Sequence, residues 1–183
     1  MRHLWRIVRE SIKLLIIASL LSSLGGLALE GIKQSLIVLL PLLIALPALN
    51  DMLGDFGIIA SSKLTTELYL GRIRKAGEAR PAALFAKLLL LGLLSASYLA
   101  LLSGSIAVLF GIELKAVMVG KLWLIAAVVT ILLLTTIFWS STALGIWLYR
   151  RGKDPANYLI PYATSAADLG SMVLFSLLVM LLF

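Results

Sequence analysis

The chain consists of long apolar runs separated by short polar segments, a pattern typical of membrane-spanning helices. About 20 mainly apolar residues are needed to cross the ~30 Å hydrocarbon core of a bilayer, and several runs are long enough. We predict an all-α integral membrane protein of five transmembrane helices, with a single domain over residues 1–183. The expected spans are about 12–29, 36–70, 82–110, 122–149 and 158–183.

The second span is expected to be broken. It contains Pro41 and Pro47, and a polar stretch from Asn50 to Asp55 follows them. Proline frees backbone carbonyl groups in a membrane helix, and such broken helices are tolerated where they line a cavity. We therefore predict that the helix is interrupted at Asn50 to Asp55 and resumes as far as Leu70.

Composition agrees with the membrane assignment. The chain is 61% hydrophobic with a mean hydropathy of +1.07, which exceeds that of soluble domains. It contains no cysteine, which excludes disulfides, thiolate metal sites and cysteine nucleophiles. The net charge of +7 does not indicate a nucleic-acid partner, because the basic residues lie in short loops between the apolar runs. The predicted environment is the lipid bilayer.

The distribution of basic residues predicts an orientation. Ten of the sixteen Lys and Arg residues fall in the N-terminal segment, the 71–80 loop and the 150–157 loop, which five spans place on one face. The positive-inside rule then puts the N-terminus in the cytoplasm and Phe183 outside a multi-pass cell (plasma) membrane protein. Residues 1–11 carry three arginines beside Trp5 and are expected to form an interfacial amphipathic turn. They also resemble the start of a signal peptide, but we interpret the apolar run that follows as a retained first span.

Aspartates inside two spans are the main candidates for chemistry. An ionised side chain at bilayer depth costs about 2.5–3.5 kcal/mol on insertion scales, so it is expected to be paired, hydrated or bound to a cation. Asp51 and Asp55 are spaced i, i+4, and so are Thr164 and Asp168, which puts each pair on one helix face. Mg²⁺ keeps several of its waters and needs few protein ligands. The predicted metal-site residues are Asp168, Asp55, Thr164 and Asp51.

Each polar residue also has a structural interpretation. Asp51 suits a helix cap or loop after a proline break, and Asp55 suits a buried ion pair with Lys63, two turns further on. Glu67 lies near the basic loop and is expected to be solvated or paired with arginines there. The Thr164 hydroxyl is expected to return a hydrogen bond to the preceding turn. Asp168, by contrast, has no basic residue within two turns in its own span.

Two segments of the chain carry recognisable motifs. The first is Pro47-Ala48-Leu49, then Gly54-Asp55, Ala60-Ser61-Ser62-Lys63-Leu64-Thr65-Thr66 and Gly71. The second is Asp154-Pro155-Ala156-Asn157, followed by Pro161, Thr164-Ser165 and Asp168. Together they resemble MgtE-type magnesium channels and the related solute carrier family 41 divalent-cation transporters. The five-span order and the cytoplasmic N-terminus agree with the same family.

The resemblance implies a two-fold pore made from two five-helix units, lined by the second and fifth helices of each. Asp168 is then the central ion-binding carboxylate, and Thr164 contributes through its carbonyl or hydroxyl. Asp55 falls where the family usually has Asn, and Ala156 replaces a second Asp of the family 41 pattern. The likeness covers the membrane domain only, so gating by cytoplasmic magnesium-sensing domains would require a separate protein.

The predicted function is therefore divalent-cation transport by a homodimer or with a paralogous half, and not enzymatic catalysis. Mg²⁺ is the first choice as transported ion, with Mn²⁺ and other divalent cations as alternatives. Two other functions remain open at this point. One is an intramembrane aspartyl protease, suggested by Gly54-Asp55, although Met52 stands where the protease motif has glycine. The other is an assembly subunit whose aspartates pair with another protein. A channel and a carrier need the same site, so the sequence does not distinguish between them.

Overall fold

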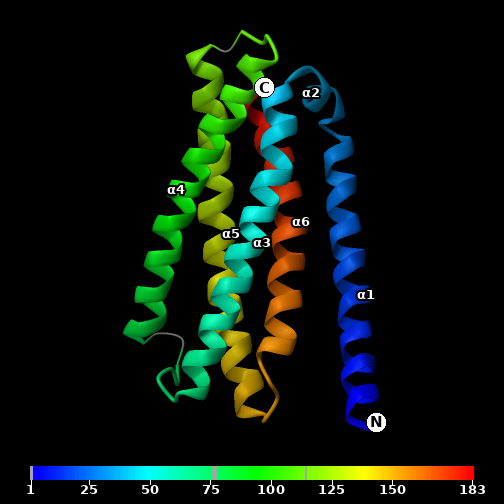
Figure 1. The fold of residues 1–183 in the computed structure, drawn as a ribbon, viewed down its shortest axis with the longest axis vertical. Helices are drawn as coiled ribbons and strands as arrows, with labels where there is room; N and C mark the ends of the chain where they lie inside the picture. The colour runs from blue at the N-terminus through cyan, green and yellow to red at the C-terminus, as the bar shows by residue number, and fades with distance from the viewer. Residues whose placement is uncertain (1, 76–77, 114) are drawn as a thin grey trace.

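The computed structural model describes residues 2–75, 78–113 and 115–183, and within them the side chains of residues 2–11, 13 and 14 are not described. Over this part the chain is helical and contains no strand, in agreement with the predicted fold class. Figure 1 shows the helices as an elongated bundle. They are α1 (Arg2–Glu30), α2 (Lys33–Val38), α3 (Leu40–Tyr69), α4 (Ala79–Leu109), α5 (Ala116–Arg150) and α6 (Ala156–Leu182).

Four helices, α3 to α6, are long and apolar enough to cross a membrane. Helix α1 runs alongside the bundle (Figure 1), and the apolar stretch within its described side chains, Leu15–Glu30, is shorter than in these four. The count of five spans therefore stays a prediction. The interfacial N-terminal turn falls largely outside the described side chains, although the backbone of residues 2–11 is continuous with α1.

The interruption expected in the second span is absent, and that prediction was wrong. Helix α3 continues through Asn50 to Asp55 with Pro47 inside it. The chain instead leaves the helix at Leu39, between α2 and α3, and Pro41 lies in the first turn of α3. A proline there costs little because its missing N–H has no partner in the helix. Unwinding at Asn50 would leave backbone groups unsatisfied in apolar surroundings, so polar side chains alone do not end the helix.

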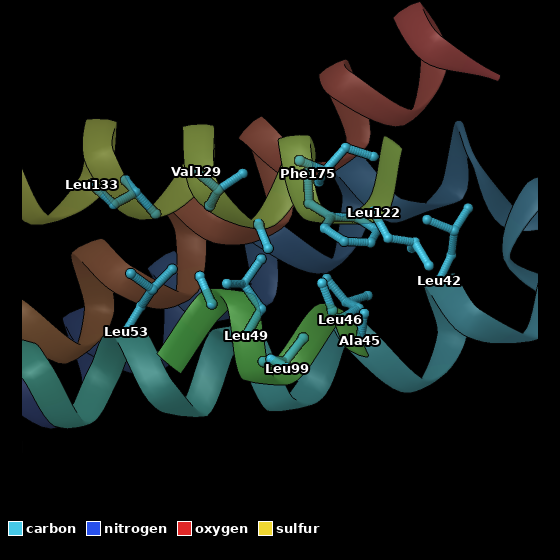
Figure 2. Packing of buried hydrophobic residues seen from close by; sticks show 14 of the residues in the cluster. Leu42, Ala45, Leu46, Leu49, Leu53, Leu99, Leu122, Val129, Leu133 and Phe175 are labelled. Carbon is cyan, nitrogen blue, oxygen red and sulfur yellow. The ribbon is translucent and has the colours of Figure 1, made fainter. Parts of the chain in front are cut away.

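Helix α3 is central to the packing and contacts α4, α5 and α6, whereas α1 packs against α6. Figure 2 shows the core where α3 faces α5, with Leu49 and Leu53 of α3 near Val129 and Leu133 of α5. Leu49, Leu53 and Val129 are fully buried. This core fixes the rotation of α3 about its axis, and hence which of its polar residues face α6.

Small residues bring α3 and α6 together. A Cβ added at Gly57 would lie 3.0 Å from the Cβ of Ala163, so the two backbones approach closely there. One turn further along α3, the Ser61 hydroxyl donates to the Leu159 carbonyl at 3.3 Å. From Gly57 to Ser61 the residue number on α3 rises, whereas the contact residue on α6 falls from Ala163 to Leu159. The two helices are therefore antiparallel. Towards the other end, this register sets Asn50 beside the middle of α6.

The loops rich in basic residues lie at one end of the bundle. The α3–α4 loop and the α5–α6 loop share this end with the N-terminus, and the C-terminus lies at the opposite end (Figure 1). Helices α3 and α5 end in the same way, with Gly71 and Gly152 at φ +65° and +68°. Glycine adopts this left-handed conformation without steric cost, which lets the last carbonyls of each helix be capped.

Candidate cation site

Asp168 lies near the middle of α6, the depth at which a carboxylate is least compatible with lipid. It follows Ala156 by 12 residues and precedes Leu182 by 14. With a rise of 1.5 Å per residue, these separations correspond to about 18 and 21 Å along the helix. Asp168 is half-buried within the chain. If α6 spans the bilayer, the carboxylate sits close to its midplane.

Both carboxylate oxygens of Asp168 accept a hydrogen bond from another helix. The Asn50 amide of α3 donates to Oδ1 at 2.9 Å, and the Ser22 hydroxyl of α1 donates to Oδ2 at 2.7 Å. Both donors are neutral, so they orient the carboxylate without offsetting its charge. Each oxygen retains a further lone pair that can accept from the water shell of a cation.

Ser171 determines which way the Asn50 amide faces. Its hydroxyl donates to the Asn50 Oδ1 and also approaches the Asp168 carbonyl at 3.1 Å. With Oδ1 occupied as an acceptor, the Nδ2 group of Asn50 is the part that faces Asp168. Ser171 is fully buried. These three residues form a network in which the carboxylate, the amide and the hydroxyl each have a defined role.

Helix α1 reaches Asp168 because Gly25 lets it approach α6 closely. A Cβ at Gly25 would lie 2.9 Å from the Met172 sulfur and 3.2 Å from the Leu169 Cα. Ser22 lies one turn before Gly25 on α1, where its hydroxyl meets Asp168. The glycine and the serine therefore act together as one contact between α1 and the site.

Replacing Gly25 by leucine should separate α1 from α6 and destabilise the protein. Overpacking at a close contact costs about 1–3 kcal/mol, so we expect the melting temperature in detergent to fall by several degrees. Gly26→Leu is the matched control, because a Cβ at Gly26 meets nothing within 4 Å. Both changes add the same apolar volume and helix propensity. Equal melting temperatures for the two variants would contradict this packing of α1.

The structure places Asp51 and Asp55 apart from the Asp168 network. Both are exposed on the outer face of α3, and no hydrogen bond of theirs is seen to any described residue. Asp51 lies inside a helix, so it is not a cap or loop residue. Together with Asn50, it lines an open hollow of about 540 Å³ beside the Pro47 turn. Asn50 therefore links this hollow to Asp168.

Thr164 lies one turn before Asp168 on α6 and is half-buried. Its hydroxyl donates back to the carbonyls of Ile160 and Pro161, both at 3.1 Å, which confirms the return bond expected from the sequence. The hydroxyl proton is thus engaged within the helix. Only the oxygen lone pairs of Thr164 could face a cation.

A complete metal cage is not formed within the single chain. Among the described residues there is no group of three or more His, Cys, Asp or Glu side chains that could hold a metal ion. The two ion pairs found in the same part of the chain both involve Glu67, which binds Arg72 and Arg80 as expected. The Asp55–Lys63 pair is not among them. Among the described side chains, Asp168 is therefore a carboxylate with neutral hydrogen-bond partners and no ion-paired cation.

Sequence reasoning missed three residues that contact Asp168. The sequence predicts Asn50 to lie in a helix break and indicates no role for Ser22 or Ser171. Ser171 had a usable signal, since it follows Asp168 by three residues and shares its helix face. Ser22 had none, because it is separated from Asp168 by 146 residues and only packing brings them together.

A family model described as "MgtE: Divalent cation transporter" matches residues 46–178, which is more than half of the chain. The match begins just before Pro47 and includes Asn50, Asp51, Asp55, Thr164 and Asp168. No curated protein and no solved structure matches the chain.

Proposed function

Because the chain belongs to the MgtE family of divalent cation transporters, we propose that it carries Mg²⁺ across the cell membrane through a site centred on Asp168. The family assignment and the four helices able to span a bilayer make it a multi-pass membrane protein. Beyond this class, we propose that the transported ion is Mg²⁺, that Asp168 is its binding site, and that the chain has five membrane spans, of which α1 is the first. The basic loops then lie in the cytoplasm and Phe183 outside.

The observation that carries this proposal is a carboxylate at mid-helix depth whose partners are all neutral. A lone charge in this position costs about 2.5–3.5 kcal/mol on insertion scales, and the bonds from Asn50 and Ser22 do not neutralise it. A passing divalent cation would. Mg²⁺ fits because it retains waters, which can donate to the free lone pairs of the carboxylate. Thr164 would face the same water shell through its oxygen lone pairs, whereas Asp51 and Asp55 would meet the ion pathway from the outer face of α3.

A second copy of the chain would complete the site. The outer face of α3 carries Asp51, Asp55, Ser62 and Thr66, all exposed in the single chain. A polar face on a membrane-spanning helix is expected to line water or protein and not lipid. Two copies related by a two-fold axis along this face would double the carboxylates around one pathway. A paralogous half could occupy the same position.

The protease alternative is not favoured. The family consists of transporters, and a protease would require two aspartates that share a proton. Asp55 is exposed on α3, whereas Asp168 is held by Ser22 and Asn50. No hydrogen bond joins the two aspartates in the part of the chain covered by the structure.

Proteoliposomes that contain a magnesium-sensitive dye test the proposal. We expect uptake of Mg²⁺ well above that of protein-free vesicles, with Mn²⁺ competing for the same pathway. Light scattering on the same purified protein should give the mass of two chains. Absence of divalent-cation uptake under any Na⁺, H⁺ or voltage gradient would contradict the function. A single-chain mass, or a second protein in fixed proportion, would contradict the self-dimer and favour an assembly subunit or a paralogous half.

A further inference from the structure

A basic cavity lies at the α3–α4 end of the bundle, away from the Asp168 network. Its volume is about 320 Å³. Four cationic side chains and one carboxylate line it, which leaves a surplus of three positive charges. They are Lys63, Arg72, Arg80, Lys87 and Glu67.

Glu67 holds the two arginines at the wall of this cavity. Arg80 approaches one of its carboxylate oxygens at 3.0 Å and Arg72 approaches the other at 3.4 Å. Ion pairs at an exposed surface contribute little stability, but here they bring two guanidinium groups together. Neither Lys63 nor Lys87 is within ion-pair distance of a carboxylate among the described residues. The two amino groups are thus available for an anion.

Lys63 and Lys87 lie deeper along their helices than the loop cations that set the orientation of the protein in the membrane. Lys63 precedes the end of α3 at Tyr69 by six residues, and Lys87 follows the start of α4 at Ala79 by eight. At 1.5 Å per residue, they lie about 9 and 12 Å inside the helix ends. Cations in the loops would be sufficient for the positive-inside bias. Two lysines inside the spans and on one cavity require a different explanation.

The cavity also offers apolar contacts beneath its charges. Ile73, Ala83 and Leu84 complete its lining; Ala83 is exposed and Leu84 is half-buried, so these two offer apolar surface, whereas Ile73 is buried. A soluble anion would gain nothing from this surface. A phospholipid presents a phosphate together with a glycerol and acyl chains, which match the cations and the apolar lining.

We propose that this cavity binds the phosphate of an anionic phospholipid. Basic pockets between membrane helices on the cytoplasmic side are suited to anionic head groups. Lys63 and Lys87 extend along the helices to meet the phosphate at the interface, as long basic side chains do. The two arginines bind it from the loop side, where their planar guanidinium groups suit phosphate geometry. The bound lipid would connect α3, which carries Asn50, to α4.

Native mass spectrometry of the protein from nanodiscs tests this site without any transport measurement. The nanodiscs contain equal amounts of dioleoyl phosphatidylglycerol and dioleoyl phosphatidylcholine. We expect phosphatidylglycerol to remain bound to the wild type, and about 10- to 30-fold weaker retention in the Lys63→Gln/Lys87→Gln variant. The control variant is Lys33→Gln/Lys115→Gln, which removes the same charge from exposed lysines at the opposite end. It should retain phosphatidylglycerol as the wild type does.

Three results would overturn the assignment. The first is equal loss of phosphatidylglycerol in both double variants, and the second is equal retention of phosphatidylcholine by the wild type. The third is displacement of the lipid by millimolar inorganic phosphate, which would identify a soluble anion as the ligand. A Lys63→Arg/Lys87→Arg variant should keep the lipid, and its melting temperature beside that of the Gln variant separates loss of binding from loss of fold.

Discussion

Asp168→Asn is expected to abolish Mg²⁺ uptake while leaving the protein folded. Two unit charges 4 Å apart interact by about 4 kcal/mol at an effective dielectric of 20, and a divalent ion at that distance gains more. Loss of the carboxylate should therefore reduce the rate of uptake by about 100-fold or more. The amide has the same shape, and one of its groups can still accept a hydrogen bond from Ser22 or Asn50. The measurement is dye-reported uptake into proteoliposomes, together with the melting temperature.

Glu113→Gln is the control for this experiment. Glu113 is exposed in the loop between α4 and α5, so its replacement removes one negative charge without touching the site. It should transport Mg²⁺ at close to the wild-type rate. If Asp168→Asn also transports normally, the proposed site is wrong, and the exposed Asp51 and Asp55 of α3 become the candidates.

Asn50→Leu is expected to weaken cation binding through its effect on Asp168. The change removes the amide that donates to Oδ1 at 2.9 Å and leaves Ser22 as the remaining donor from another helix. A hydrogen bond to a charged group contributes about 1.5–3 kcal/mol. We therefore expect about a 10- to 100-fold higher Mg²⁺ concentration for half-maximal uptake, since 1.4 kcal/mol is about tenfold.

Asn157→Leu is the matched control, because Asn157 is exposed in the first turn of α6 and far along the helix from Asp168. The concentration dependence is the informative readout for both variants. A destabilised protein would have a lower maximal rate of uptake because fewer molecules are active. A misplaced carboxylate would instead raise the Mg²⁺ concentration needed for half-maximal uptake. An unchanged half-maximal concentration in Asn50→Leu would show that Asn50 does not position Asp168.

The error at Asn50 shows where sequence reasoning about this chain was too local. Asn50, Asp51 and the nearby prolines suggested a break because these residue types end helices in water. Helix α3 nevertheless continues through Asn50, which keeps its backbone groups paired within the helix. The helix accommodates these polar side chains because each one points towards a polar partner or an open hollow. Asn50 faces α6, where its amide is bound, and Asp51 faces the open hollow.

Other predictions needed only short-range information and agree with the structure. The pairing of Glu67 with loop arginines depends on residues within 13 positions of one another. The return bond of Thr164 depends on the turn that precedes it. The resemblance to the MgtE family came from two motifs, and the family match over residues 46–178 bears it out. Transport of Mg²⁺ in particular, the dimer and the site residues remain proposals.

The sequence by itself determined the helical membrane class, the approximate ends of the long helices and the family. These follow from the length of apolar runs, from the polar segments between them and from motifs along the chain, all of which are local properties. Only the tertiary structure decided which side chains meet Asp168. That choice depends on how far each helix is rotated and shifted, and contacts at Gly57 with Ala163 and at Gly25 with Leu169 set both. Such contacts join residues more than 100 positions apart, so no local pattern encodes the partnership of Asp168 with Asn50 and Ser22.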